Sequence, residues 1–214
     1  MIPFKYIFHA LIVPGSILIP IILFITRYKN AKPEAKVLFY FLITSSLINI
    51  SAIIISRFHK TNLPLLHLFT IVEAIFLLLY FRLILKGHLI KKIIFYLIVI
   101  FPILCILNFS FLQSIYSFNT YTRPLEAILI TFLCLMYLYK SDLTAHWLQQ
   151  PNNWFNLGIL IYFPVAFVIF VSSNYFTSGT NSAMKTMVWN LHAALVLLMY
   201  LAWAKGFSLI KKDG

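Results

Sequence analysis

Ionisable side chains interrupt several long apolar stretches of this sequence. Glu73 lies near the middle of residues 64–86, and His192 lies equally far into residues 183–205. A charge at the centre of a bilayer costs at least about 2.5–3.5 kcal/mol on insertion scales, so such a residue is by default a candidate for function. A Glu73–His192 pair would be sensitive to protons, because both side chains can change charge.

Further polar residues are candidates for the same site. His67 is six residues from Glu73 and lies on another face of a helix, which favours a structural hydrogen bond. Glu126 follows Arg123 by three residues, a spacing that permits an ion pair within one helix at the rim of the membrane. The predicted ligand-binding residues are Glu73, His192, Glu126, His67, His9, Arg123 and Asn49.

Imidazole and carboxylate groups are also metal ligands, so catalysis by a metal has to be considered. No HExxH spacing, GxSxG motif or nucleotide-binding fingerprint occurs in the chain. A metal-dependent intramembrane hydrolase is therefore an alternative based on residue types alone. The sequence identifies no metal or cofactor, and it favours a function without catalysis.

The composition defines the elements that must position these residues. The chain has 214 residues, of which 62% are hydrophobic and 10% charged. Soluble domains have about 25% charged residues. The net charge of +12 could suggest nucleic acid, but the basic residues lie in short loops between apolar stretches. We therefore predict an all-α polytopic membrane protein whose partner is the lipid bilayer and not a nucleic acid.

The apolar stretches predict seven transmembrane helices in one domain that spans residues 1–214. The first stretch has no convincing small-residue cleavage site, which favours a retained helix over a signal peptide. The predicted helices cover residues 6–25, 37–56, 64–86, 93–112, 124–139, 154–175 and 183–205.

The distribution of Lys and Arg predicts the orientation of these helices. The odd-numbered loops and the C-terminal tail hold twelve of them, against five in the N-terminus and the even-numbered loops. Because basic loops remain in the cytoplasm, the N-terminus is expected outside and the C-terminus inside. The abundance of Ile, Phe, Lys and Asn suits a multi-pass protein of a bacterial inner (plasma) membrane.

Depth along the helices predicts where the polar residues meet. Glu73 and His192 each lie about 14 Å from the outer end of their helix, at a rise of 1.5 Å per residue. The other candidates lie closer to the outer face, whereas the inner halves are apolar, as in the segment FLLLYF after Glu73. This asymmetry predicts a polar pocket that opens to the outside and has an apolar floor.

A shift of 119 residues suggests an internal repeat. It superposes Asn62 on Asn181, Lys86-Gly87 on Lys205-Gly206, and Glu73 on His192. The predicted topology allows a 3+1+3 parallel repeat with the fourth helix as a linker. In this layout the chain resembles the SWEET and PQ-loop transporters, although the first and fifth helices lack the Pro-Gln pair of that family.

Three functions fit these observations, and the sequence favours the first of them. The one-sided pocket favours ligand sensing or binding, with output through a membrane or cytoplasmic signalling partner, because a receptor needs access from one face only. The repeat favours a small-solute or proton-coupled transporter, which needs a path exposed alternately to both faces. The third alternative is the intramembrane hydrolase described above.

Overall fold

The computed structural model describes residues 8, 12–141, 146–178 and 182–213, in which all regular structure is helical. Six helices are long and apolar enough to cross a membrane, and Val13–Ile25 forms a shorter apolar segment. The expected all-helical membrane fold is thereby confirmed. The elements are α2 (Val13–Ser16), α3 (Leu18–Ile25), α4 (Pro33–Arg57), α5 (Leu63–Ile84), α6 (His88–Leu107), the π-helical turn η2 (Asn108–Leu112), α7 (Thr122–Lys140), the 3₁₀ turn η3 (Trp147–Gln149), α8 (Pro151–Val171), α9 (Ser173–Ser178) and α10 (Ser182–Ser208).

Two helix boundaries differ from the sequence prediction for identifiable reasons. The first apolar segment is divided at Ile17, because Pro20 lacks the N–H that would bond to the carbonyl of Ser16. Helix α6 begins at His88 and not at residue 93, so Lys91 and Lys92 lie in its first turns and not in a loop. The turn before α6 is short because Gly87 adopts a φ of 110°, a conformation that favours glycine.

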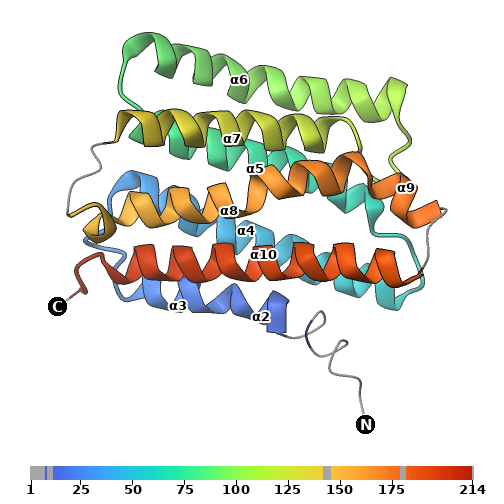
Figure 1. Ribbon diagram of the computed structural model, residues 1–214, viewed down its shortest axis with the longest axis horizontal. Coiled ribbons are helices and arrows are strands. Elements are labelled where there is room, and N and C mark those ends of the chain that lie inside the picture. Colours follow the sequence, from blue (N-terminus) through green and yellow to red (C-terminus); the bar gives the residue numbers. More distant parts are fainter. Residues whose placement is uncertain (1–7, 9–11, 142–145, 179–181, 214) are drawn as a thin grey trace.

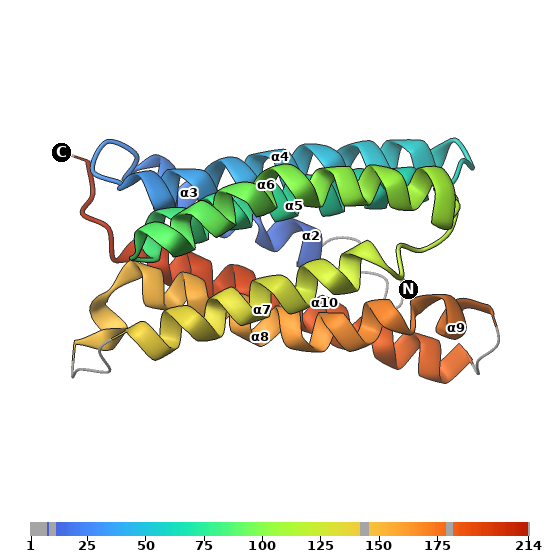
Figure 2. The same ribbon diagram turned by 90° about the horizontal axis from the view of Figure 1, so that it is seen from above.

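Six of the helical segments form a closed ring. Neighbours in contact follow the order α3, α4, α5, α7, α8, α10 and back to α3, whereas α6 packs on the outside of α5 (Figure 1). Figure 2 shows the bundle as two layers, with α4, α5 and the outer helix α6 on one side and α7, α8 and α10 on the other. The cyclic order is compatible with the 3+1+3 repeat, because α3–α4–α5 and α7–α8–α10 occupy equivalent places in it.

The half of the ring nearer the predicted cytoplasmic side of the membrane has a densely packed aromatic core. The indole of Trp203 is fully buried, its Nε1 donates to the carbonyl of Phe155 at 3.0 Å, and its ring lies 5.8 Å from that of Phe41. Helices α8 and α10 approach closely because Gly158 leaves room for this indole. The expected apolar floor is therefore a solid core in the described residues.

The C-terminal tail closes the ring at its predicted inner end. The carboxylate of Asp213 accepts hydrogen bonds from the backbone N–H groups of Lys29 and Asn30, at 3.2 and 3.3 Å. The Arg27 guanidinium donates to the carbonyl of Ile210 at 3.1 Å. We call these contacts the C-terminal clasp, which joins the loop before α4 to the residues after α10.

Candidate functional site

Helix α7 begins inside the bundle and not at the end of the bundle that is predicted to face outside. The side chain of Asn119, which is 2% exposed, donates to the hydroxyl of Thr70 in α5 at 3.2 Å. Its Oδ1 accepts hydrogen bonds from the N–H and hydroxyl of Thr122 and from the N–H of Arg123. This side chain thus satisfies free N–H groups of the first turn of α7 and fixes that turn at the depth of Thr70.

The depth of α7 places Arg123 beside Glu73, and this corrects the expectation that Arg123 lies at the rim. Its Nη1 is 2.9 Å from Oε2 of Glu73 and 3.6 Å from Oε2 of Glu126. Arg123, Glu73 and Glu126 are 4%, 3% and 1% exposed, respectively. We call these three residues the ionic cluster. The predicted spacing of Arg123 and Glu126 does produce an ion pair, but a buried one.

Aromatic side chains enclose the guanidinium of Arg123. Its Cζ lies 5.0 Å from the ring centre of Phe69 in α5 and 4.4 Å from that of Phe170 in α8. These distances are typical of cation–π contacts, which are stronger where water is excluded. The hydroxyl of Tyr162 in α8 also interacts with this guanidinium. Arg123 therefore contacts side chains of α5 and α8 in addition to Glu126 of its own helix.

The hydrogen-bonding capacity of the ionic cluster is incompletely used. Oε2 of Glu73, Nε and Nη1 of Arg123 and Oε1 of Glu126 are buried and make no hydrogen bond of good geometry with the described residues. The Arg123–Glu73 contact is thus an ion pair whose atoms are close but poorly aligned. Buried polar groups are normally hydrogen-bonded, so such atoms mark a site for water, an ion or a proton.

His192 reaches the ionic cluster through Tyr162. Its Nε2 lies 3.0 Å from the hydroxyl of Tyr162, and its ring packs edge-on against those of Tyr162, Phe170 and Trp189. The described contacts connect His192 to Glu73 through Tyr162 and Arg123. Four helices, α5, α7, α8 and α10, contribute to this connected set.

Residues 113–121, between η2 and α7, cover the ionic cluster from the predicted outer end. His67 contacts the carbonyl of Ser117 through Nε2 at 3.1 Å. Phe118 stacks on Trp189 of α10 with ring centres 5.7 Å apart, and its carbonyl accepts a hydrogen bond from Asn174. His67 thus has the structural contact that its position favoured. The expected pocket open to the outside is closed here, because the cluster side chains are almost inaccessible.

The remaining predicted residues lie elsewhere. Asn49 is exposed on α4, away from the ionic cluster, because its position faces outward from the ring. His9 lies outside the described residues. Among the residues described, no group of three or more His, Cys, Asp or Glu side chains could hold a metal ion. The structure therefore brings together Glu73, Arg123, Glu126 and, indirectly, His192.

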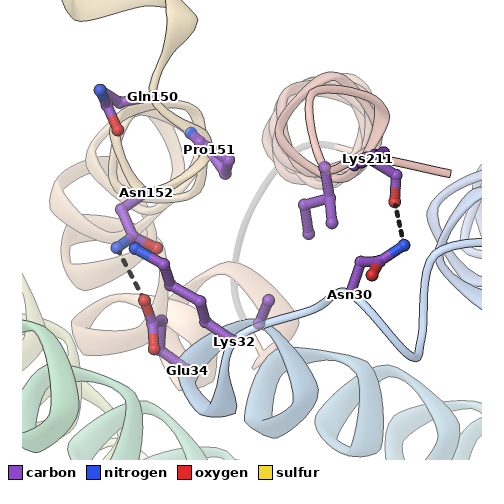
Figure 3. Close-up of a pocket in the computed structure, with 9 residues that line it drawn as sticks. Asn30, Lys32, Glu34, Gln150, Pro151, Asn152 and Lys211 are labelled. Atoms are coloured by element: carbon purple, nitrogen blue, oxygen red, sulfur yellow. Dashed lines mark hydrogen bonds between the residues drawn. The ribbon is translucent and has the colours of Figure 1, made fainter.

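Two cavities lie away from the ionic cluster. One of about 200 Å³ lies at the predicted inner end, between the starts of α4 and α8 and the C-terminal tail. Figure 3 shows Glu34 and Asn152 joined by a hydrogen bond on one side of it and Asn30 and Lys211 on the other. The second, of about 320 Å³, is an apolar groove between α7 and α8 that includes Phe132.

Two residues that organise the site are missed by sequence reasoning. Tyr162 gives no signal, because a tyrosine within an apolar helix has no distinctive spacing. Asn119 belongs to a polar segment of the sequence, where asparagine is common and indicates a loop. Asn119 lies three residues before the helix starts at Thr122, and the N-cap position itself is Tyr121, so the sequence carries no ordinary capping signal for it.

The fold and the site define the class of this protein as an integral membrane protein with a ring of apolar helices around a buried ionic cluster. The chain matches no protein-family model, no curated protein and no solved structure.

Proposed function

We propose that the protein is a small-solute transporter of the inner membrane, with the ionic cluster as its functional site. The observation that carries this proposal is the ion pair of Glu73 and Arg123, which joins the two halves of the ring. Glu73 belongs to α5 in the first group of three helices, and Arg123 belongs to α7 in the second. In transporters built from repeats, the binding site lies at the interface between the repeats.

The ion pair supports a role in switching between conformations. A separation of the two halves would take the Glu73 carboxylate away from Arg123 and leave it unpaired in an apolar environment, which is strongly unfavourable. A solute with a charged or polar group could replace one partner of the pair and so permit the separation. The covered cluster fits a closed conformation of such a cycle.

The test is uptake by the full chain reconstituted into proteoliposomes. Radiolabelled carboxylates, amines and sugars are screened first, and the solute taken up best is used to compare variants. Glu73→Gln and Arg123→Gln are expected to lower the uptake rate at least tenfold. Glu34→Gln is the matched control, because Glu34 is a carboxylate at the predicted inner end. Unchanged uptake by both cluster variants contradicts the proposal.

Ligand sensing with output through a partner protein is the second candidate. It is favoured by the packed core around Trp203, which blocks the predicted inner half of the ring. A sensor would bind a solute with the same dependence on Glu73 and Arg123 but would accumulate none in the proteoliposomes. It would also co-purify with a membrane or cytoplasmic signalling protein.

A further inference from the structure

We infer that the ionic cluster is a proton-binding site that holds one proton on the carboxyl groups of Glu73 and Glu126. The inference deepens the proposed function. The proton site itself does not depend on that function; only the coupling of the proton to transport rests on it. Binding itself is a simple proton transfer, in which a carboxylate accepts a proton from hydronium and becomes a carboxylic acid while water is released.

The charges within the cluster support one bound proton. Two carboxyl groups share a single guanidinium, so the fully ionised cluster has a net charge of −1. All three side chains are at most 5% exposed. A buried charge without a partner is strongly unfavourable, so a neutral cluster is preferred. One proton makes it neutral.

The distances indicate which carboxyl group holds the proton. Nη1 of Arg123 is 2.9 Å from Glu73 but 3.6 Å from Glu126, so Glu73 is the better partner of the guanidinium. Each carboxyl group has one buried oxygen without a hydrogen-bond partner among the described residues, Oε2 of Glu73 and Oε1 of Glu126, so the distance to Arg123 distinguishes them. We therefore place the proton on Glu126, while Glu73 remains ionised.

The other titratable groups described around the cluster do not supply a second cation. Cys105 of α6 lies near Glu126, Tyr162 of α8 lies near all three members, and Tyr200 of α10 lies near Glu73. A thiol and two phenols are neutral at neutral pH. The Nε2 of His192 lies 3.0 Å from the hydroxyl of Tyr162.

A proton suits the space at the cluster better than a metal ion does. A metal ion needs several ligands at once, and no group of three suitable side chains converges in the described part of the chain. The two cavities described above lie elsewhere. A proton needs only one carboxyl oxygen and no cavity.

Infrared difference spectroscopy of the full chain in nanodiscs can count the protonated carboxyl groups through their C=O stretch at neutral pH. We expect one protonated buried carboxyl group per chain in the wild type. Glu73→Gln and Glu126→Gln should each abolish the band, because the remaining carboxylate then pairs with Arg123. Arg123→Gln should double the band, and Arg123→Lys should retain it. The small number of acidic residues, five in the chain, makes the assignment practical.

Glu34→Gln is the control, and its band should equal that of the wild type. A wild type without the band overturns the inference, as does a Glu126→Gln variant that keeps it. If Arg123→Gln does not fold, as judged by size-exclusion chromatography and circular dichroism, the two Glu→Gln variants decide the question.

The infrared experiment tests the proton site, and the uptake assay tests transport, so each claim can be rejected without the other. The predicted band pattern together with absent uptake would leave the proton site in place and reject transport. Uptake that depends on Glu73, combined with the wrong band pattern, would reject the proton site alone.

Discussion

Arg123 shows most clearly what a single residue contributes to this molecule. It neutralises Glu73, pairs with Glu126 and packs between Phe69 and Phe170. A lysine would retain the charge but not the flat guanidinium face that stacks on two rings. The residue types and spacing predicted that Glu73 lies within the membrane and that Arg123 and Glu126 are spaced for an ion pair, which was expected at the rim. The partner of Glu73 could not be predicted, because it depends on contacts between distant parts of the chain.

The hydrogen bond between Tyr162 and His192 gives a prediction at the same scale. Tyr162→Phe should lower the free energy of unfolding by about 1 kcal/mol, because a buried hydroxyl and its imidazole partner lose their bond. A double-mutant cycle with His192→Phe should give a coupling energy of about 0.5–1.5 kcal/mol. Denaturant unfolding in detergent micelles measures both quantities.

Tyr116→Phe is the control for this cycle, because Tyr116 is 67% exposed in the segment that covers the cluster. Its combination with His192→Phe should be additive. Additive behaviour of Tyr162→Phe with His192→Phe would show that the 3.0 Å contact contributes nothing to stability.

At the scale of the element, the buried start of α7 depends on one asparagine. Asn119→Ala removes an acceptor for three donors and a donor to Thr70. We expect a loss of about 1–3 kcal/mol in stability, the sum expected for a helix cap and a buried hydrogen bond. Hydrogen exchange of the first turn of α7 should accelerate as well.

Asn49→Ala provides the comparison, because Asn49 is an exposed asparagine on α4. A surface substitution of this kind usually changes stability by less than about 0.5 kcal/mol. Equal effects of the two substitutions would contradict the capping role of Asn119.

The close approach of α8 and α10 gives another prediction at this scale. A Cβ at Gly158 would lie 2.8 Å from Cδ1 of Trp203 and 3.1 Å from the carbonyl oxygen of Met199. Gly158→Ala should therefore destabilise the protein by about 1–3 kcal/mol through overpacking. Gly15→Ala is the control, because a Cβ at Gly15 would have no described neighbour within 4 Å. Thermal unfolding followed by circular dichroism distinguishes the two variants.

The helices themselves were largely predictable because lipid imposes a simple pattern on the chain. A run of about 20 apolar residues is enough to identify a membrane helix. The start of α6 could not be found this way, since Lys91 and Lys92 are polar yet helical. Nor could the depth of α7, because residues 113–121 are polar and fold inward through Asn119 and His67.

At the scale of the whole molecule, the ring could not be deduced from the sequence. Hydropathy identifies helices but not their neighbours, and the contact of α10 with α3 joins opposite ends of the described chain. The 119-residue shift that aligned Glu73 with His192 remains a prediction. The two residues have different partners, Arg123 and Tyr162.

The orientation in the membrane is testable with single cysteines. Ser114→Cys lies at the predicted outer end and Gln149→Cys at the predicted inner end, and both positions are exposed. A membrane-impermeant maleimide added to intact cells should label Ser114→Cys at least tenfold faster than Gln149→Cys, because basic loops remain in the cytoplasm. The native Cys105 and Cys134 are buried and should give little background. The reverse labelling pattern would invert the topology.

The C-terminal clasp has a consequence for biosynthesis. The segment that contains α3 leaves the ribosome long before α10 and Asp213. In the finished ring, α10 packs against α3, and Asp213 binds the backbone of Lys29 and Asn30 after α3. Until translation reaches those residues, the nascent chain can have α3 only beside α4, with the other flank of α3 facing lipid or the insertion machinery. Ring closure is therefore a post-insertion event, and a substitution at Asp213 should slow maturation of newly made chains more than it disturbs finished ones.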